Sequence, residues 1–173
     1  MSDDTPTTRR RETVWEDPRA IGATAAEMTG LDFMRALRDG KVPAPPIAVT
    51  VGFDLTEAEE GRTAFTCTPG EHHYNLIGSV HGGLVATLID SATGTAVHTT
   101  LAKGELYGTV NLSVDMLRPV TDKTGTLITE GEVVHRGRNI AIATAETKGE
   151  QDGKVYARGQ ATCFIYKVDG RGG

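Results

Sequence analysis

The segment 84–101 is apolar almost throughout and carries one formal charge, Asp90. A carboxylate without partners in such a helix costs several kcal/mol, so its presence needs a reason. The segment directly follows His81-Gly82-Gly83, and a Gly-Gly turn that opens a helix leaves backbone N–H donors free. A carboxylate and free N–H donors on one helix are typical of a site that attacks a carbonyl group.

Size and composition restrict the class of protein. The chain has 173 residues and 38% apolar residues, enough for one domain with a substantial core. Its net charge of -5 argues against nucleic acid as a partner. Two cysteines without CxxC spacing indicate neither a disulfide framework nor a thiolate zinc site, and they favour the cytoplasm. Because Asp90, His98 and several threonines interrupt 84–101, we expect a core helix and no membrane partner.

Composition divides the chain into three parts. Residues 1–20 are polar and charged without periodicity, so we expect a flexible tail. Within 21–46, Thr29 can cap a short helix that ends at Gly40, and this N-terminal helical segment is expected to pack against the rest. Residues 47–168 contain the remaining hydrophobic periodicity and are expected to form the main domain.

The pattern within the main domain predicts an α+β fold. A helix at 81–102 that is apolar nearly all round needs cover on most sides, which an antiparallel sheet wrapped around it provides. Gly94 weakens this helix by about 1 kcal/mol relative to Ala, which favours close approach by another element, such as a partner subunit. Period-two alternation or flanking turns place the expected strands at 47–56, 62–68, 109–116, 124–134, 139–148 and 154–167.

One motif gives the chain a family likeness. The residues are Tyr74-Asn75-x-x-Gly78-x-x-His81-Gly82-Gly83, with Asp90 nine positions after the histidine. The set resembles the hotdog-fold acyl-CoA thioesterases of the PaaI type, from phenylacetate degradation. The resemblance extends from about residue 31 to 166 and implies a hotdog fold, in which an antiparallel sheet wraps one long central helix.

The resemblance also implies catalytic roles at matching positions. The Gly82 N–H would hold the thioester oxygen, and Asn75 would help to polarise the carbonyl. Asp90 would act as general base or as nucleophile. His81 would orient the loop or touch the thioester. Thr109 stands where relatives often place a hydroxyl that positions water, although the strand pattern puts it on the face opposite Val110 and Leu112.

Substrate-binding positions follow from the same resemblance. Coenzyme A carries phosphates, and arginines at strand ends and turns could reach them. The acyl pocket is expected along the helix, at Leu84, Val85, Leu88 and Ile89. The expected substrate-binding residues are Gly83, Leu84, Arg118, Arg136, Gly137 and Arg138, and Arg158 is a further candidate for the phosphates.

The spacing of the site residues predicts an oligomer. Gly82 and Asp90 are eight positions apart, about 12 Å along one helix, which is farther than one thioester centre reaches. If two helices pack antiparallel across a two-fold axis, Asp90 of one subunit approaches Gly82 and Asn75 of the other. We therefore expect at least a homodimer, further paired into a dimer of dimers, with acyl-CoA as substrate.

Three other interpretations compete with thioester hydrolysis. A non-catalytic acyl-CoA-binding or regulatory module would use the same pocket to sense ligand. A metal site at His72, His73, His81 and Asp90 lacks any helical ligand spacing, so neither metal nor cofactor is expected. A hotdog hydratase is disfavoured because Thr95 stands where its histidine would be.

Overall fold

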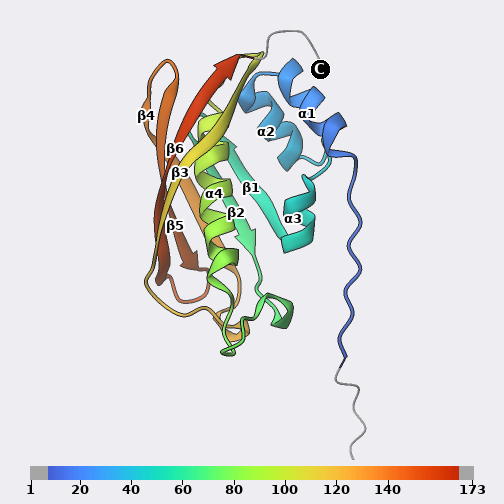
Figure 1. Ribbon diagram of the computed structural model, residues 1–173, viewed down its shortest axis with the longest axis vertical. Helices are drawn as coiled ribbons and strands as arrows, with labels where there is room; N and C mark the ends of the chain where they lie inside the picture. Colours follow the sequence, from blue (N-terminus) through green and yellow to red (C-terminus); the bar gives the residue numbers. More distant parts are fainter. Residues whose placement is uncertain (1–7, 168–173) are drawn as a thin grey trace, which may run out of the picture.

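The computed structural model describes residues 8–167. Within them, three short helices precede a β-hairpin, a long helix follows, and four strands complete the chain (Figure 1). Single 3-10 turns lie at Glu71–His73 and Asp122–Thr124. The helices are α1 (Pro18–Glu27), α2 (Gly30–Arg38), α3 (Pro46–Val51) and α4 (Gly82–His98), and the strands are β1 (Phe53–Glu59), β2 (Arg62–Cys67), β3 (Glu105–Met116), β4 (Leu127–Arg136), β5 (Ile140–Gly149) and β6 (Val155–Lys167).

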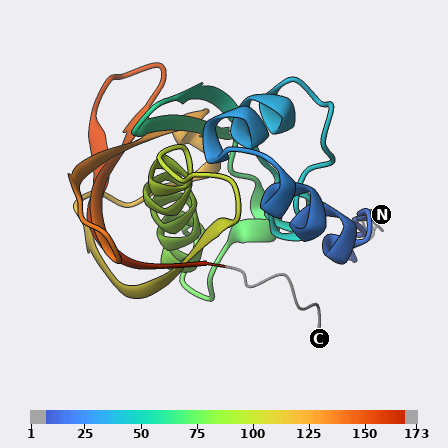
Figure 2. The ribbon, with the colours of Figure 1, turned by 90° about the horizontal axis from the view of Figure 1, so that it is seen from above.

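The six strands form one antiparallel sheet in the order β1-β2-β4-β5-β6-β3. Seen along α4, the sheet curls around that helix, and α1 to α3 lie on the side where the curl is open (Figure 2). This is the α+β architecture that the sequence pattern predicted and the hotdog fold that the family resemblance implied. Strands β1 and β3 are the two edges, so the open side lies between them.

The core lies between α4 and the concave face of the sheet. Leu88, Ile89 and Val97 are fully buried there, and full burial of such a side chain contributes about 2 kcal/mol. Gly131 of β4 allows the sheet to approach α4 closely, because a Cβ at this position would lie 2.3 Å from the Ala92 carbonyl oxygen. The apolar helix is therefore a core helix, with its carboxylate on a different face from these residues.

The first predicted strand is wrong over its first half. Residues 46–51 form α3, and the strand begins only at Phe53. Pro46 occupies the first turn of α3, where its missing N–H is not needed, and Gly52 ends the helix with a φ of 88°. Ala48 faces the core while Ile47 is half exposed, which is helical rather than alternating burial. The β-branched residues of this segment produced the misleading period of two.

The N-terminal segment contains one helix, α1, that the sequence did not predict. The expected tail 1–20 includes residues outside the described range, and within that range α1 already begins at Pro18, capped by the Asp17 side chain. Arg11 donates to the carbonyls of Thr50 and Val49 at the end of α3. Thr29 caps α2 as predicted.

Gly94 is explained within one chain. A Cβ there would lie 2.6 Å from the hydroxyl oxygen of Tyr107, so the tyrosine ring of β3 lies directly on the helix backbone. The expected close approach is therefore real, but the approaching element is β3 of the same protomer and not a partner subunit.

Strand β3 has a free edge. It pairs with β6 on one side, and within residues 8–167 no strand pairs with its other side. Val110 is 62% exposed and Met116 is 49% exposed along it. A long, apolar, unpaired edge is a template for another strand. None of the described helices combines the length and hydropathy required to cross a bilayer.

Candidate functional site

The N-terminus of α4 presents one free backbone donor. His81 is the N-cap, and its Nδ1 accepts from the Gly83 N–H at 2.8 Å. The Leu84 N–H donates to the His81 carbonyl. For the Gly82 N–H, no acceptor exists among residues 8–167, so this group remains available to a ligand. His81 thus caps α4 at its N-terminus.

Gly82 tolerates a side chain and Gly83 does not. A Cβ on Gly83 would lie 2.9 Å from the capping Nδ1 of His81, so the cap requires glycine there. A Cβ on Gly82 would meet the Met116 methyl at 3.5 Å, an ordinary contact.

Asn75 organises the loop before α4. Its Oδ1 accepts from the N–H groups of Ile77 and Ser79, and its Nδ2 donates to the Ser79 hydroxyl at 3.0 Å. An amide NH₂ has two hydrogens, so one donor remains for a ligand. The loop is also tied to Val120, whose carbonyl accepts from Val80. Asn75 is therefore positioned by its own loop, seven residues before the free Gly82 donor.

Asp90 and Thr109 meet across α4 and β3. The Thr109 hydroxyl donates to Asp90 Oδ1 at 3.0 Å. The strand pattern had placed Thr109 on the wrong face, and the reason is a β-bulge between Thr109 and Asn111. A bulge adds one residue to the strand and shifts the alternation that follows it. The carboxylate is half buried, so it is both held and reachable.

The Tyr107 hydroxyl and the Cys163 thiol lie close to this pair. Burial raises the pKa of the Cys163 thiol, although its hydrogen bond with the Thr109 hydroxyl opposes that rise. Burial also raises the pKa of Tyr107, and the nearby Asp90 charge adds to both effects. Both groups are therefore neutral at pH 7. Sequence reasoning missed Tyr107 and Cys163, because only the strand pairing brings Cys163 opposite Thr109.

The structure brings the predicted catalytic residues together only in part. Asp90 and Thr109 are in contact, while Gly82 is eight residues before Asp90 on the same helix, about 12 Å away along its axis. No single protomer places the free N–H and the carboxylate around one carbonyl group.

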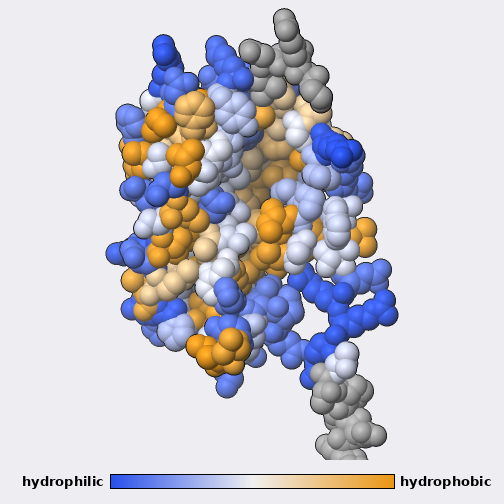
Figure 3. Space-filling model, viewed as in Figure 1, coloured by the Kyte–Doolittle hydropathy of each residue, from blue (hydrophilic) through white to orange (hydrophobic). Residues whose placement is uncertain are grey.

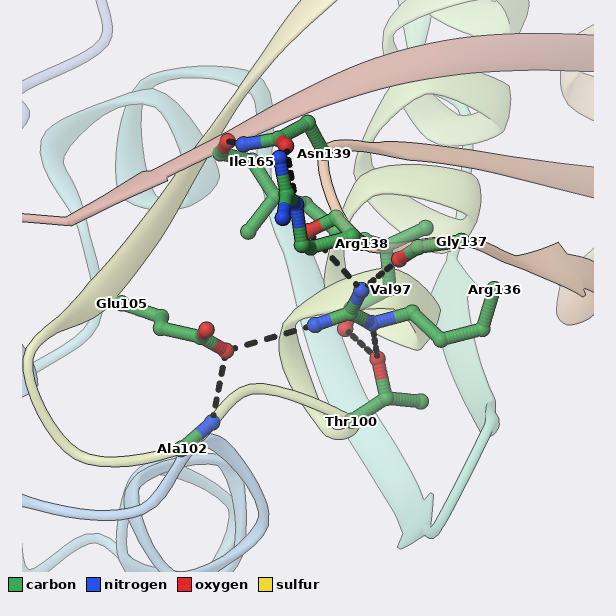
Figure 4. A network of polar contacts seen from close by, with 9 residues as sticks. All are labelled: Val97, Thr100, Ala102, Glu105, Arg136, Gly137, Arg138, Asn139 and Ile165. Carbon is green, nitrogen blue, oxygen red and sulfur yellow. Dashed lines mark hydrogen bonds and ion pairs between the residues drawn. The ribbon is translucent and has the colours of Figure 1, made fainter.

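Arg136 is engaged away from this region. Its Nη2 lies 3.3 Å from Glu105 and its Nε donates to Thr100 at the C-terminal end of α4, as Figure 4 shows. Its guanidinium also donates to the Gly137 carbonyl. Arg138 is exposed and donates to its neighbour Asn139. Of these turn residues, Arg138 is therefore the freer cation, and Arg136 has a structural role in its own protomer.

Arg118 lies beside the free donor. It lines a cavity of about 270 Å³ together with Gly82, Val85 and Met116, and its guanidinium donates to the Val155 carbonyl. Arg158, in contrast, is paired with Glu146 on another part of the sheet. Of the predicted arginines, Arg118 therefore lies near the start of α4, whereas the other three lie elsewhere in the protomer.

The four residues expected to line the acyl pocket lie in the core of the protomer. Leu84, Leu88 and Ile89 are core residues with at most 7% of their surface exposed, and Val85 lines the cavity beside Gly82. These residues face the sheet because the sheet covers that side of α4. A larger cavity of about 610 Å³ lies against another face of the helix, which carries Ser91 and Thr95.

The histidines considered as metal ligands serve other purposes. His73 Nδ1 accepts from the Gly70 N–H, and its Nε2 lies 2.7 Å from the Val51 carbonyl. The rings of His72 and His73 lie side by side, 3.8 Å apart. In the part of the chain that the structure describes, no three His, Cys, Asp or Glu side chains gather as a metal site would require.

Known sequences similar to this chain are thioesterases and esterases. The model of the thioesterase superfamily matches residues 77–156, which include Gly82, Asp90 and Thr109. A candidate esterase of Halobacterium salinarum is 42% identical over 123 residues, which are 67% of this chain and 80% of that protein. Acyl-coenzyme A thioesterase 13 of Homo sapiens is 29% identical over 108 residues, which are 62% of this chain and 76% of that protein.

Solved structures give the same result. A candidate thioesterase from Ralstonia eutropha JMP134, described as related to phenylacetic acid degradation, has a TM-score of 0.68 and 29% identity. The match covers 76% of this chain and 98% of that chain. A Streptococcus mutans UA159 protein bound to acetyl CoA has a TM-score of 0.60 and 26% identity, over 66% of this chain and 89% of that one.

Proposed function

This chain belongs to the thioesterase superfamily and is a thioester hydrolase, and we propose that it hydrolyses acyl-CoA to a free acid and CoA. The observation that carries the proposal is the Asp90 carboxylate, which accepts a hydrogen bond from Thr109 of β3. Asp90 lies on the same helix, α4, that begins with the free Gly82 N–H. The relatives named acyl-coenzyme A thioesterase and the neighbour that binds acetyl CoA support the choice of thioester.

In the proposed reaction, Asp90 is the general base. It takes a proton from a water molecule while the water oxygen bonds to the thioester carbon. The carbonyl oxygen becomes an oxyanion that accepts from the Gly82 N–H and from the remaining Asn75 amide hydrogen. The C–S bond then breaks and the CoA thiolate leaves. The thiolate takes the proton from Asp90, which is thereby returned to its ionised form. Because thiolates leave readily, no serine or cysteine nucleophile is needed.

The proposed site is shared between two protomers. Gly82 and Asp90 are too far apart on one helix, whereas two α4 helices antiparallel about a two-fold axis would bring each Asp90 to the partner's helix start. The free edge of β3 supports this arrangement, because pairing with a second copy would satisfy its backbone groups. Dimers of such dimers remain part of the proposal.

We propose that two cations receive the CoA phosphates. Arg118 borders the cavity beside Gly82, and Arg138 is exposed at the β4–β5 turn. A guanidinium matches phosphate geometry well. Arg136 contributes indirectly, by fixing the turn that carries Arg138. Both cysteines are free and buried, which fits a reducing compartment, and we propose the cytoplasm.

Release of free thiol tests the proposal. Purified protein is incubated with acyl-CoAs from acetyl to palmitoyl and with aromatic acyl-CoAs, and the free CoA thiol is measured. We expect turnover, and we expect Asp90→Asn to abolish it while thermal unfolding stays the same. Calorimetry that detects acyl-CoA binding in the absence of turnover would overturn hydrolysis and favour a ligand-sensing module. Undiminished turnover by Asp90→Asn would overturn the role of this residue.

A further inference from the structure

The cavity of about 610 Å³ has no role in the reaction described so far. It lies where the sheet curls open, between β1 and β3, and the segment from α2 to α3 closes it on the outside. Figure 3 shows hydrophobic side chains in the hollow between α4 and these N-terminal helices. Its volume is within the range of roughly 300–1,000 Å³ that is usual for sites binding small organic molecules.

The lining of this cavity is mainly apolar. Its two charged residues, Arg38 and Asp54, are exposed, so they lie toward its mouth, and Arg38 is paired with Asp39. The Thr95 hydroxyl is satisfied by the Ser91 carbonyl at 2.6 Å. An occupant therefore meets the hydroxyls of Ser91 and Tyr107 among mainly apolar side chains. Hydrophobic lining comes from Leu37, Val42, Pro45, Ile47, Leu55 and Phe65.

The cavity lies one residue along α4 from the carboxylate that we propose as the base, and Asp90 itself is not part of its lining. Ser91, which follows Asp90 directly, lines it, and so does Tyr107. Tyr107 lies over Gly94, one helical turn beyond Asp90, and it is two residues from the Thr109 that holds the carboxylate. An acyl chain whose thioester carbon lies near Asp90 and which extends toward the C-terminus of α4 therefore enters this space.

We propose that this cavity receives the acyl group of the thioester, in the same protomer that supplies Asp90, and that it selects apolar acyl groups of medium length. The proposal rests on the proposed thioesterase function and names its substrate class. Gly94 fixes this part of the wall, because a side chain there would collide with the Tyr107 ring, which lines the cavity. The prolines at 43, 45 and 46 stiffen the outer wall, which limits how long an acyl chain can be accommodated.

The test changes the cavity wall at Ile47, which is half exposed and so tolerates replacement. Ile47→Trp narrows the cavity and Ile47→Ala widens it. Thr50→Trp, on the same helix but outside the cavity, is the matched control. The measured quantity is kcat/KM for decanoyl-CoA divided by that for acetyl-CoA. We expect this ratio to fall at least about tenfold in Ile47→Trp and to stay unchanged in Thr50→Trp.

A second filling variant, at Ser91, and the substrate preference of Ile47→Ala provide two further checks. Ser91→Leu fills the cavity from the helix and is expected to lower the same ratio. Ile47→Ala is expected to move the preferred substrate to longer chains. An unchanged ratio in both filling variants would overturn the proposal while leaving thioesterase activity established.

Binding is measured independently of turnover, with decanoic acid as the probe in calorimetry. We expect the native protein to bind decanoic acid and Ile47→Trp to bind it at least about tenfold more weakly. If no acyl-CoA is hydrolysed, the thioesterase function fails, and this readout alone decides about the cavity. Equal binding by both proteins, or none by either, would overturn the acyl pocket.

Discussion

The Thr109 hydroxyl donates to Asp90 Oδ1 at 3.0 Å, joining the edge strand β3 to the central helix at the point where we place the chemistry. The bond leaves Oδ2 of Asp90 without a hydrogen-bond partner among the described residues. Because the hydroxyl fixes one oxygen, the other has a defined direction toward a water molecule. Thr109 is thus a positioning residue for the proposed base.

Removing this hydroxyl tests its role. Thr109→Val keeps the shape of the side chain and lacks the donor, and Thr109→Ser keeps the donor. A hydrogen bond to a charged group contributes about 1.5–3 kcal/mol, so we expect kcat to fall about 10- to 100-fold in Thr109→Val. Thr109→Ser should recover most of the rate, as measured by thiol release. Equal rates in the two variants would contradict a positioning role.

Gly82 offers a clean test of the oxyanion donor. It is the first residue of α4, where proline is tolerated, and His81 before it has the extended ψ of 133° that proline requires. Gly82→Pro therefore removes the N–H and preserves the helix. One oxyanion donor is worth about 10²- to 10³-fold in kcat, and we expect a loss of that size. Gly82→Ala, which keeps the N–H and makes only an ordinary contact with Met116, is the control.

Mixing two inactive variants tests whether the site is shared. In a dimer of one Gly82→Pro subunit and one Asp90→Asn subunit, one of the two shared sites has both defects and the other has neither. After random exchange of subunits, half of the dimers are mixed, so about a quarter of the native activity should return. Sites contained within one protomer would give no recovery, and thiol release distinguishes the two outcomes.

Much of the fold could be predicted because the relevant patterns are local. The apolar segment around Asp90 predicted α4, and alternation with flanking turns predicted the later strands. The strand prediction for 46–51 was wrong because the β-branched residues at 47, 49 and 51 follow a period of two. Pro46 and Gly52 instead impose a helix start and a helix end. Backbone constraints at two residues outweighed the pattern of three side chains.

The site was harder to predict than the fold, since it depends on irregularities and on pairing. Alternation assumes a regular strand, and the bulge after Thr109 turns that residue toward Asp90. The large cavity was missed because its walls come from segments far apart in the chain, such as Ile47 and Tyr107. A helix pattern shows which residues are apolar, and only the surrounding sheet decides that Leu88 belongs to the core.

His81 can be separated into its two possible roles. As N-cap it accepts from the Gly83 N–H, and loss of such a cap costs about 1 kcal/mol. We expect His81→Ala to lose about that much stability in chemical denaturation. His81→Asn supplies another good cap and should restore stability. If His81 only orients the helix start, His81→Asn also restores thiol release, whereas a stable but inactive variant would show that the imidazole contacts the thioester.

His98 makes stability depend on pH. Its ring lies between Phe33 and Tyr107, at centroid distances of 5.4 and 5.7 Å, and within residues 8–167 its Nε2 is a buried nitrogen without a hydrogen-bond partner. Burial lowers the pKa of His98 to about 4 from its usual 6.5. The unfolded chain therefore binds the proton more readily than the folded one between these values, and stability is lost as pH falls through this window.

The full effect of His98 is about 3 kcal/mol, since one pKa unit corresponds to about 1.4 kcal/mol. We expect the native protein to lose most of this between pH 6.5 and 4.5, in urea unfolding at fixed temperature. His98→Leu fills the same apolar site without a titrating group, so its free energy of unfolding should change less over that interval. Parallel pH profiles for the two proteins would mean that the imidazole takes up its proton without leaving the contact between α2, α4 and β3.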